Sequence, residues 1–134
     1  MNDFQELINH SHDMAEKLLL EQSGEFYPFG AKIDNYGDLT HTGQYSGEEF
    51  PSSQTMLTKF KDYFENEIRD NKIRAYAITF DCLAKRSSDS DKTDAIAIEC
   101  FSTENGQRTI YYFPYKRAIN DELEFGESWA ITSD

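Results

Sequence analysis

The chain has 134 residues, enough for one domain with a hydrophobic core that needs no metal or disulfide. Acidic residues outnumber basic ones 25 to 13, which gives a net charge of −12, and no basic run is longer than two residues, as at Lys116-Arg117. Because phosphate binding depends on clustered Lys and Arg, this balance argues against a nucleic-acid-binding protein. The aromatic content of 14% argues against a disordered chain.

The first predicted element is an amphipathic helix over residues 2–22. Acidic residues interrupt this segment, so we expect neither a secretion signal nor a membrane span, and we place the protein in the cytoplasm. His10 and His12 are two residues apart and point to different faces of a helix, which is the wrong spacing for two ligands of one metal. The apolar positions that follow helical spacing are Phe4, Leu7, Ile8, Ala15, Leu18 and Leu19.

Residues 26–46 are predicted to form a β-hairpin, because strand-like runs flank the turn sequence Asn35-Tyr36-Gly37-Asp38. A second amphipathic helix follows over residues 52–70, with Ser52 or Ser53 as its N-cap. Its apolar stripe consists of Met56, Leu57, Phe60, Phe64 and Ile68.

The second half of the chain is predicted to form strands. Residues 73–84 are rich in β-branched and aromatic side chains and indicate a central strand. Strands over 94–102 and 107–115 flank Asn105-Gly106, a strong hairpin signal. Beyond this hairpin the pattern is mixed and favours only a last strand over 127–132.

This order of elements predicts an α+β fold for residues 1–134 as a single domain. We expect one antiparallel sheet of about five or six strands, with both helices packed on one of its faces. Cys82 and Cys100 lie on neighbouring predicted strands. Because no secretion signal directs the chain to an oxidising compartment, we expect both to be free thiols.

A two-residue turn at Asn105-Gly106 would fix the register of its hairpin. Ile98 would then face Phe113 on a wholly apolar side, which belongs against the helices. Glu99 would face Tyr112 on the other, more mixed side.

Four residues are candidates for a ligand or partner surface: Asp81, Asp94, Glu99 and Tyr112. Glu99 is a carboxylate in the middle of an apolar strand, where an unpaired charge is costly. If the strands bring the three acids together, they could bind a hard cation or act as a general acid and base. Otherwise they are acids on an exposed sheet face. No catalytic motif, zinc site or cofactor motif is recognisable, so we expect no cofactor.

Three segments in the order EFYPFGAKIDNYGDLT, KIRAYAITFDCL and TDAIAIECFSTENGQRTIYYFPY resemble a family of small uncharacterised bacterial α+β proteins. That family has a Phe-Tyr-Pro-Phe hairpin, a central strand beginning near Arg-Ala, and an Asp-Ala-Ile strand with an acid near its end, closed by Pro-Tyr. The likeness covers residues 25–115 and implies a bacterial cytoplasmic domain. It implies no activity and no catalytic residue. Where members often place His after the acid, this chain has Cys100.

Three functions remain open. The first is a non-enzymatic acidic protein that recognises a basic protein partner, as immunity proteins and inhibitors do, because complementary charge promotes such encounters. The second is a small-ligand or metal-binding domain built on the carboxylate cluster. The third is an enzyme with a carboxylate acid/base. In each case we expect a monomer or homodimer.

Overall fold

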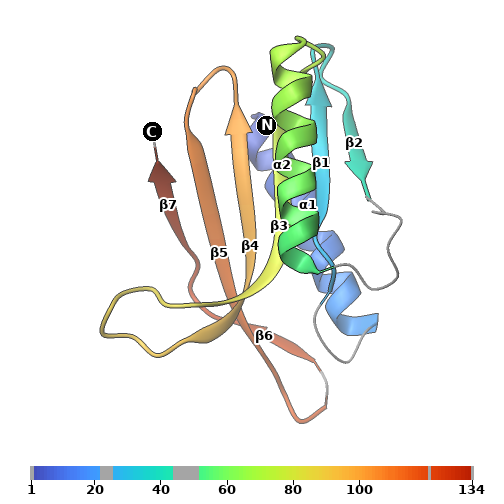
Figure 1. The fold of residues 1–134 in the computed structure, drawn as a ribbon. Coiled ribbons are helices and arrows are strands. Elements are labelled where there is room, and N and C mark those ends of the chain that lie inside the picture. The colour runs from blue at the N-terminus through green and yellow to red at the C-terminus, as the bar shows by residue number, and fades with distance from the viewer. Residues whose placement is uncertain (1, 22–25, 44–51, 121, 134) are drawn as a thin grey trace.

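The computed structural model describes residues 2–21, 26–43, 52–120 and 122–133. Its secondary structure confirms the α+β class (Figure 1). None of the helices in these ranges is long and apolar enough to cross a membrane. The elements are α1 (Asp3–Glu21), β1 (Phe29–Asp34), β2 (Leu39–Thr42), α2 (Ser53–Arg69), β3 (Ile73–Ala84), β4 (Thr93–Ser102), β5 (Arg108–Arg117), β6 (Leu123–Phe125) and β7 (Trp129–Ser133).

The strands form one antiparallel sheet in the order β2-β1-β3-β4-β5, with β3 in the centre as predicted. The long strand β5 carries two short neighbours, because β6 pairs with its C-terminal end and β7 with its N-terminal part. The predicted last strand is therefore present as β7, whereas β6 was not predicted. The far end of the predicted 26–46 hairpin lies outside the described residues.

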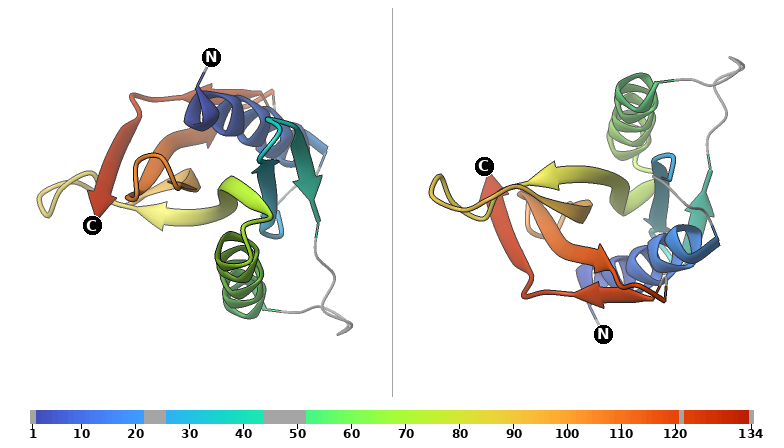
Figure 2. Two further views of the ribbon diagram at one scale, coloured as in Figure 1. Left: turned by 90° about the horizontal axis from the view of Figure 1, so that it is seen from above. Right: turned by 90° about the horizontal axis from the view of Figure 1, so that it is seen from below.

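The two helices cover opposite faces of the sheet, and Figure 2 shows the β1–β3 part of the sheet between them. α1 shares a buried cluster with Ala75 and Ala77 of β3. α2 packs on the other side, where Phe64 stacks on Tyr76 with ring centroids 4.9 Å apart. The expectation of both helices on one face is therefore wrong. The physical reason is that β3 is apolar on both faces, and a strand buried on both sides needs cover on both.

The close approach of α2 to the sheet depends on Gly30 of β1. A Cβ atom at this position would lie 2.6 Å from Cζ of Phe64, closer than two non-bonded carbon atoms can come. The absence of a side chain thus lets the aromatic stripe of α2 lie directly on the strand. The helix begins as predicted, because Oγ of the N-cap Ser52 accepts a hydrogen bond from the Thr55 N–H at 3.1 Å.

The β4–β5 hairpin has a longer connection than its sequence suggested. Residues 103–107 join the two strands, and Ile98 pairs with Tyr111, a shift of two residues from the prediction. The Thr103 N–H donates to the backbone carbonyl of Arg74 at 2.9 Å, which ties the start of the connection to β3. Since side chains alternate with period two, this shift leaves every residue on its predicted face.

Candidate functional site

One face of the sheet is covered only in part. α2 lies over β1 and β3 and reaches the hairpin end of β4 and β5 through Phe101 and the Arg108–Glu65 ion pair, but no helix of the described residues lies over the rest of this face of β4, β5 and β7 (Figure 1). We call this uncovered region the open face. Strand alternation and register define its side chains: Phe80, Ala97, Glu99, Ile110, Tyr112, Trp129 and Ile131.

The side chains of the open face are mainly aromatic and aliphatic. Tyr112 and Trp129 are a cross-strand pair and stack with centroids 5.2 Å apart and planes at 19°. Ile131 beside them is 54% exposed. The guanidinium of Arg86 lies 5.2 Å from the centre of the Trp129 ring, a cation–π contact. An apolar patch with polar groups at its edge is typical of an interaction surface.

Glu99 lies at the centre of the open face, between Ile78 of β3 and Ile110 of β5. Its side chain is only 13% exposed, and its ion pair with Lys61 of α2 is long, at 3.9 Å. Burial raises the pKa of Tyr112, and the nearby Cys82 thiol and then Glu99 add to this shift. The arrangement therefore places a carboxylate among apolar side chains, with the long Lys61 ion pair and the nearby charge of Arg108 as its compensation.

A small cavity opens beside Glu99, between α2 and the sheet. It has a volume of about 160 Å³, and Leu57, Lys61, Ile78 and Phe80 contribute to its walls. Pockets for drug-sized molecules usually measure roughly 300–1,000 Å³. The cavity is thus better suited to one inserted side chain than to a whole small molecule.

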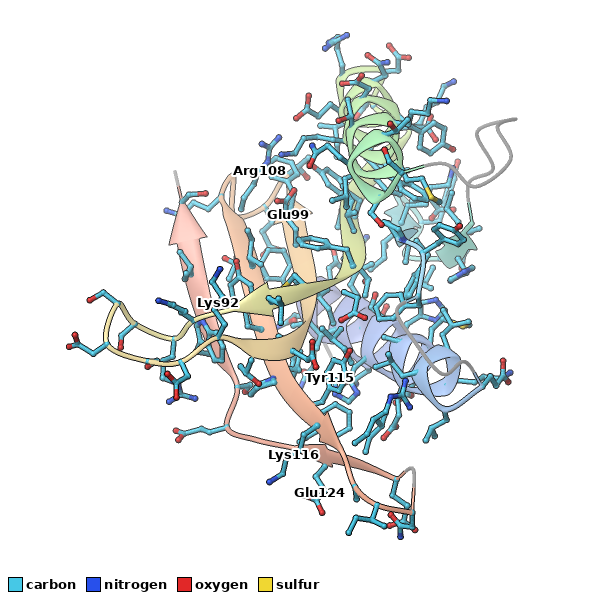
Figure 3. All side chains as sticks on the ribbon, turned by 60° about the horizontal axis from the view of Figure 1, so that its bottom comes forward. Lys92, Glu99, Arg108, Tyr115, Lys116 and Glu124 are labelled. Carbon is cyan, nitrogen blue, oxygen red and sulfur yellow. The ribbon has the colours of Figure 1, made fainter. Side chains whose placement is uncertain are left out.

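Asp81 and Asp94 lie on the opposite face, the one that α1 covers. The hydroxyl of the buried Tyr115 donates to Oδ1 of Asp81 at 2.8 Å, and Asp94 is exposed. Burial and then this hydrogen bond raise the pKa of Tyr115. Figure 3 shows Glu99 near α2 and Tyr115 towards β6.

The predicted acids therefore do not form one cluster. In the β3–β4 register Asp81 faces Ile96, whereas Glu99 faces Ile78, so the two carboxylates leave the sheet on different sides. Of the four candidate residues, Glu99 and Tyr112 share the open face, whereas Asp81 and Asp94 share the other face. Sequence reasoning missed Trp129, Arg86 and Lys61, which come from distant segments. In the sequence, only the alternation of the apolar residues Trp129 and Ile131 along β7 could have indicated that this strand contributes to the open face.

The cysteines are free and do not form a reactive site. Cys100 pairs with Ala77 and Cys82 with Ala95, so their side chains lie on opposite faces. Burial raises the pKa of Cys82 to about 11 and that of Cys100 to about 12. Because the thiolate is the nucleophile, neither residue is activated.

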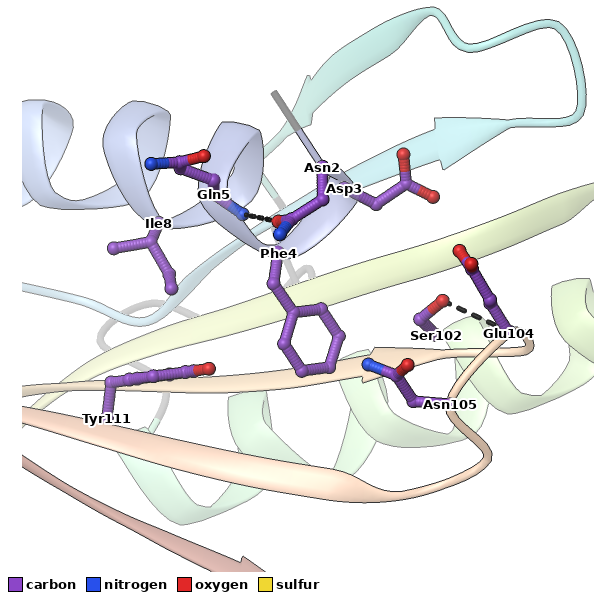
Figure 4. A pocket seen from close by; sticks show the side chains of 9 residues that line it. All are labelled: Asn2, Asp3, Phe4, Gln5, Ile8, Ser102, Glu104, Asn105 and Tyr111. Carbon is purple, nitrogen blue, oxygen red and sulfur yellow. Dashed lines mark hydrogen bonds between the residues drawn. The ribbon is translucent and has the colours of Figure 1, made fainter.

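A larger cavity of about 360 Å³ lies between the start of α1 and the β4–β5 hairpin (Figure 4). Its polar groups already serve the fold. Oδ1 of Asn2 accepts from the Gln5 N–H at 2.8 Å and caps α1. Asp3 accepts two hydrogen bonds from the Arg74 guanidinium, each 2.9 Å long. These contacts give the cavity wall a structural role.

A scan against protein-family models, a search of the curated proteins and a search of the solved structures each found no match to this chain. The fold and the open face thus define an α+β domain with a partly uncovered antiparallel sheet. The resemblance to small bacterial proteins stays a prediction.

Proposed function

We propose that this protein is a non-enzymatic binding protein whose open face receives a basic segment of a protein partner. The observation that carries the proposal is the state of Glu99. Its carboxylate is 13% exposed, lies among apolar side chains and has a 3.9 Å ion pair with Lys61. Since a desolvated charge needs a close partner, an inserted Lys or Arg side chain would stabilise it.

The surroundings of Glu99 support recognition of a protein. Tyr and Trp are enriched at the centres of protein interfaces, and Tyr112 and Trp129 form a stacked pair here. Arg86 on Trp129 indicates that a guanidinium fits this aromatic pair. The net charge of −12 would speed the encounter with a basic partner. The resemblance noted in the sequence suggests that this occurs in the cytoplasm of a bacterium.

A small amine is the alternative occupant. The cavity beside Glu99 supports it, because Phe80 and Ile78 offer apolar walls and Glu99 offers a countercharge. Its volume of about 160 Å³ limits such a ligand to a small one.

The fluorescence of Trp129 tests the proposal, because it is the single tryptophan of the chain and lies on the open face. We expect peptides that combine Arg or Lys with an aromatic residue to change its emission in a saturable way, whereas acidic peptides do not. Glu99→Gln should weaken binding about tenfold or more, since it removes a desolvated charge partner.

Asp94→Asn is the matched control. It removes the same charge from an exposed position on the opposite face, so it should leave binding unchanged. If Glu99→Gln and the parent respond equally, the attraction is non-specific and the proposal fails. A saturable response to a simple alkylamine but to no peptide would favour the alternative instead.

A further inference from the structure

Two of the three histidines of the chain meet at a site away from the open face. Nε2 of His10 in α1 lies 2.9 Å from Nδ1 of His41 in β2. The ring centroids are 5.1 Å apart, with the planes inclined by 60°. The two residues are 31 positions apart, so the folded chain rather than local sequence brings their nitrogens together.

We propose that His10 and His41 form a binding site for a divalent transition-metal ion of the Zn²⁺, Cu²⁺ or Ni²⁺ type, which would join α1 to β2. Imidazole nitrogen is a preferred ligand of these ions. With metal–nitrogen bonds of about 2.0–2.1 Å, two nitrogens on a tetrahedral ion lie roughly 3.3 Å apart. Binding would therefore move the nitrogens apart by a few tenths of an ångström and rotate the rings, because their present centroid separation places the two ring axes nearly in line along the hydrogen bond. Water can complete the coordination, because His41 is exposed.

Contacts within the fold hold the two rings close together without a metal. The ring of Phe29 lies against His41, with centroids 5.2 Å apart. The pairing of His41 with Ala31 fixes its backbone in the sheet. Burial lowers the pKa of both histidines, so both rings are neutral at neutral pH, and the one proton that the facing nitrogens share would move to the far nitrogen of its ring on metal binding. The charge of Asp13, which acts on His10, would also favour a cation.

A second group of potential ligands lies nearby and serves as an internal comparison. Ligand atoms of His12, Asp13 and Glu16 on α1 lie within 4.8 Å of one another. The ring of His12, however, packs against both Phe113 and Phe125, each with centroids 4.8 Å away. Packing against the two phenylalanine rings explains the position of His12 without a metal. We therefore assign the metal to the His10–His41 pair.

Thermal melting of the full chain with Zn²⁺ or Ni²⁺ tests the assignment, because a ligand of the folded state raises its Tm. We expect a rise of a few degrees in the parent and in His12→Gln. We expect no rise in His10→Gln or His41→Gln, since Gln can still hydrogen bond but is a poor ligand for these ions. Cu²⁺ electron paramagnetic resonance should show two nitrogen ligands in the parent and one in each of these two variants.

Metal-free circular dichroism of each variant establishes that it is folded before metal is added. Retention of the metal-induced rise in His10→Gln or His41→Gln, with its loss in His12→Gln, would overturn the proposal in favour of the helical group. The absence of any rise in the parent would also overturn it. In that case the pair is a hydrogen bond alone.

Discussion

Glu99 is placed where its charge loses most of its hydration. Its strand neighbours are Ile78 and Ile110, and its ion pair with Lys61 is 3.9 Å long. Such a long contact with a half-exposed amine compensates poorly for desolvation. Residues that destabilise the free protein in this way are often retained because they contribute to binding.

The variant Glu99→Gln separates the effect of this charge on stability from its effect on binding. Glu99→Gln should leave the free energy of unfolding unchanged or raise it by up to about 1 kcal/mol, because it removes an enclosed charge at nearly constant shape. Urea titration of the parent, Glu99→Gln and the control Asp94→Asn measures this. A loss of more than about 1 kcal/mol in Glu99→Gln alone would mean that the fold needs the charge.

Sequence reasoning located Glu99 correctly but not its surroundings. Its mid-strand position and its face follow from alternation, which is a local property. Lys61 and Trp129 could not be assigned to it, because the first depends on which face α2 covers and the second on the pairing of β7 with β5.

Apart from β6, the elements and the antiparallel sheet were predicted, but the faces that the two helices cover were not. The amphipathic patterns of α1 and α2 are local, so they fixed the helix bounds closely. The face that each helix covers depends on β3, where Ala75 and Ala77 alternate with Tyr76 and Ile78, and both sets are apolar. Because both faces of β3 are apolar, its sequence does not show which face each helix covers.

The contact between α1 and β2 through His10 and His41 predicts a pH dependence of stability. Burial lowers the pKa of both histidines from 6.5. The charge of His10 lowers the pKa of His41 further, whereas the charge of Asp13 opposes the shift of His10. Below about pH 6.5 the unfolded chain therefore binds more protons than the folded one, so this part of the stability is lost as the pH falls.

Without added metal, the Tm of the parent should fall more between about pH 7.5 and about pH 5.5 than that of the double variant His10→Gln/His41→Gln. His12→Gln should follow the parent. Parallel curves for the parent and the double variant would show that the pair does not titrate with folding.

At the scale of the whole molecule, α1 and α2, the two helices of the described residues, cover one end of the sheet on both faces, and the other end is covered on a single face. α1 spans β1, β3 and β4, whereas α2 lies mainly on β3 and β1 (Figure 2). The strands β5 and β7 thus present Tyr112, Trp129 and Ile131 to their surroundings. Under the proposed function, a basic partner would therefore bind at one defined place on this acidic protein.

Chemical-shift mapping of a bound basic peptide by NMR tests this claim most directly. With backbone amides assigned, we expect the perturbed residues to lie in β4, β5 and β7, centred on Glu99 and Tyr112, with α1 unaffected. Perturbations centred on α1 and β2, or spread evenly over the acidic surface, would contradict it.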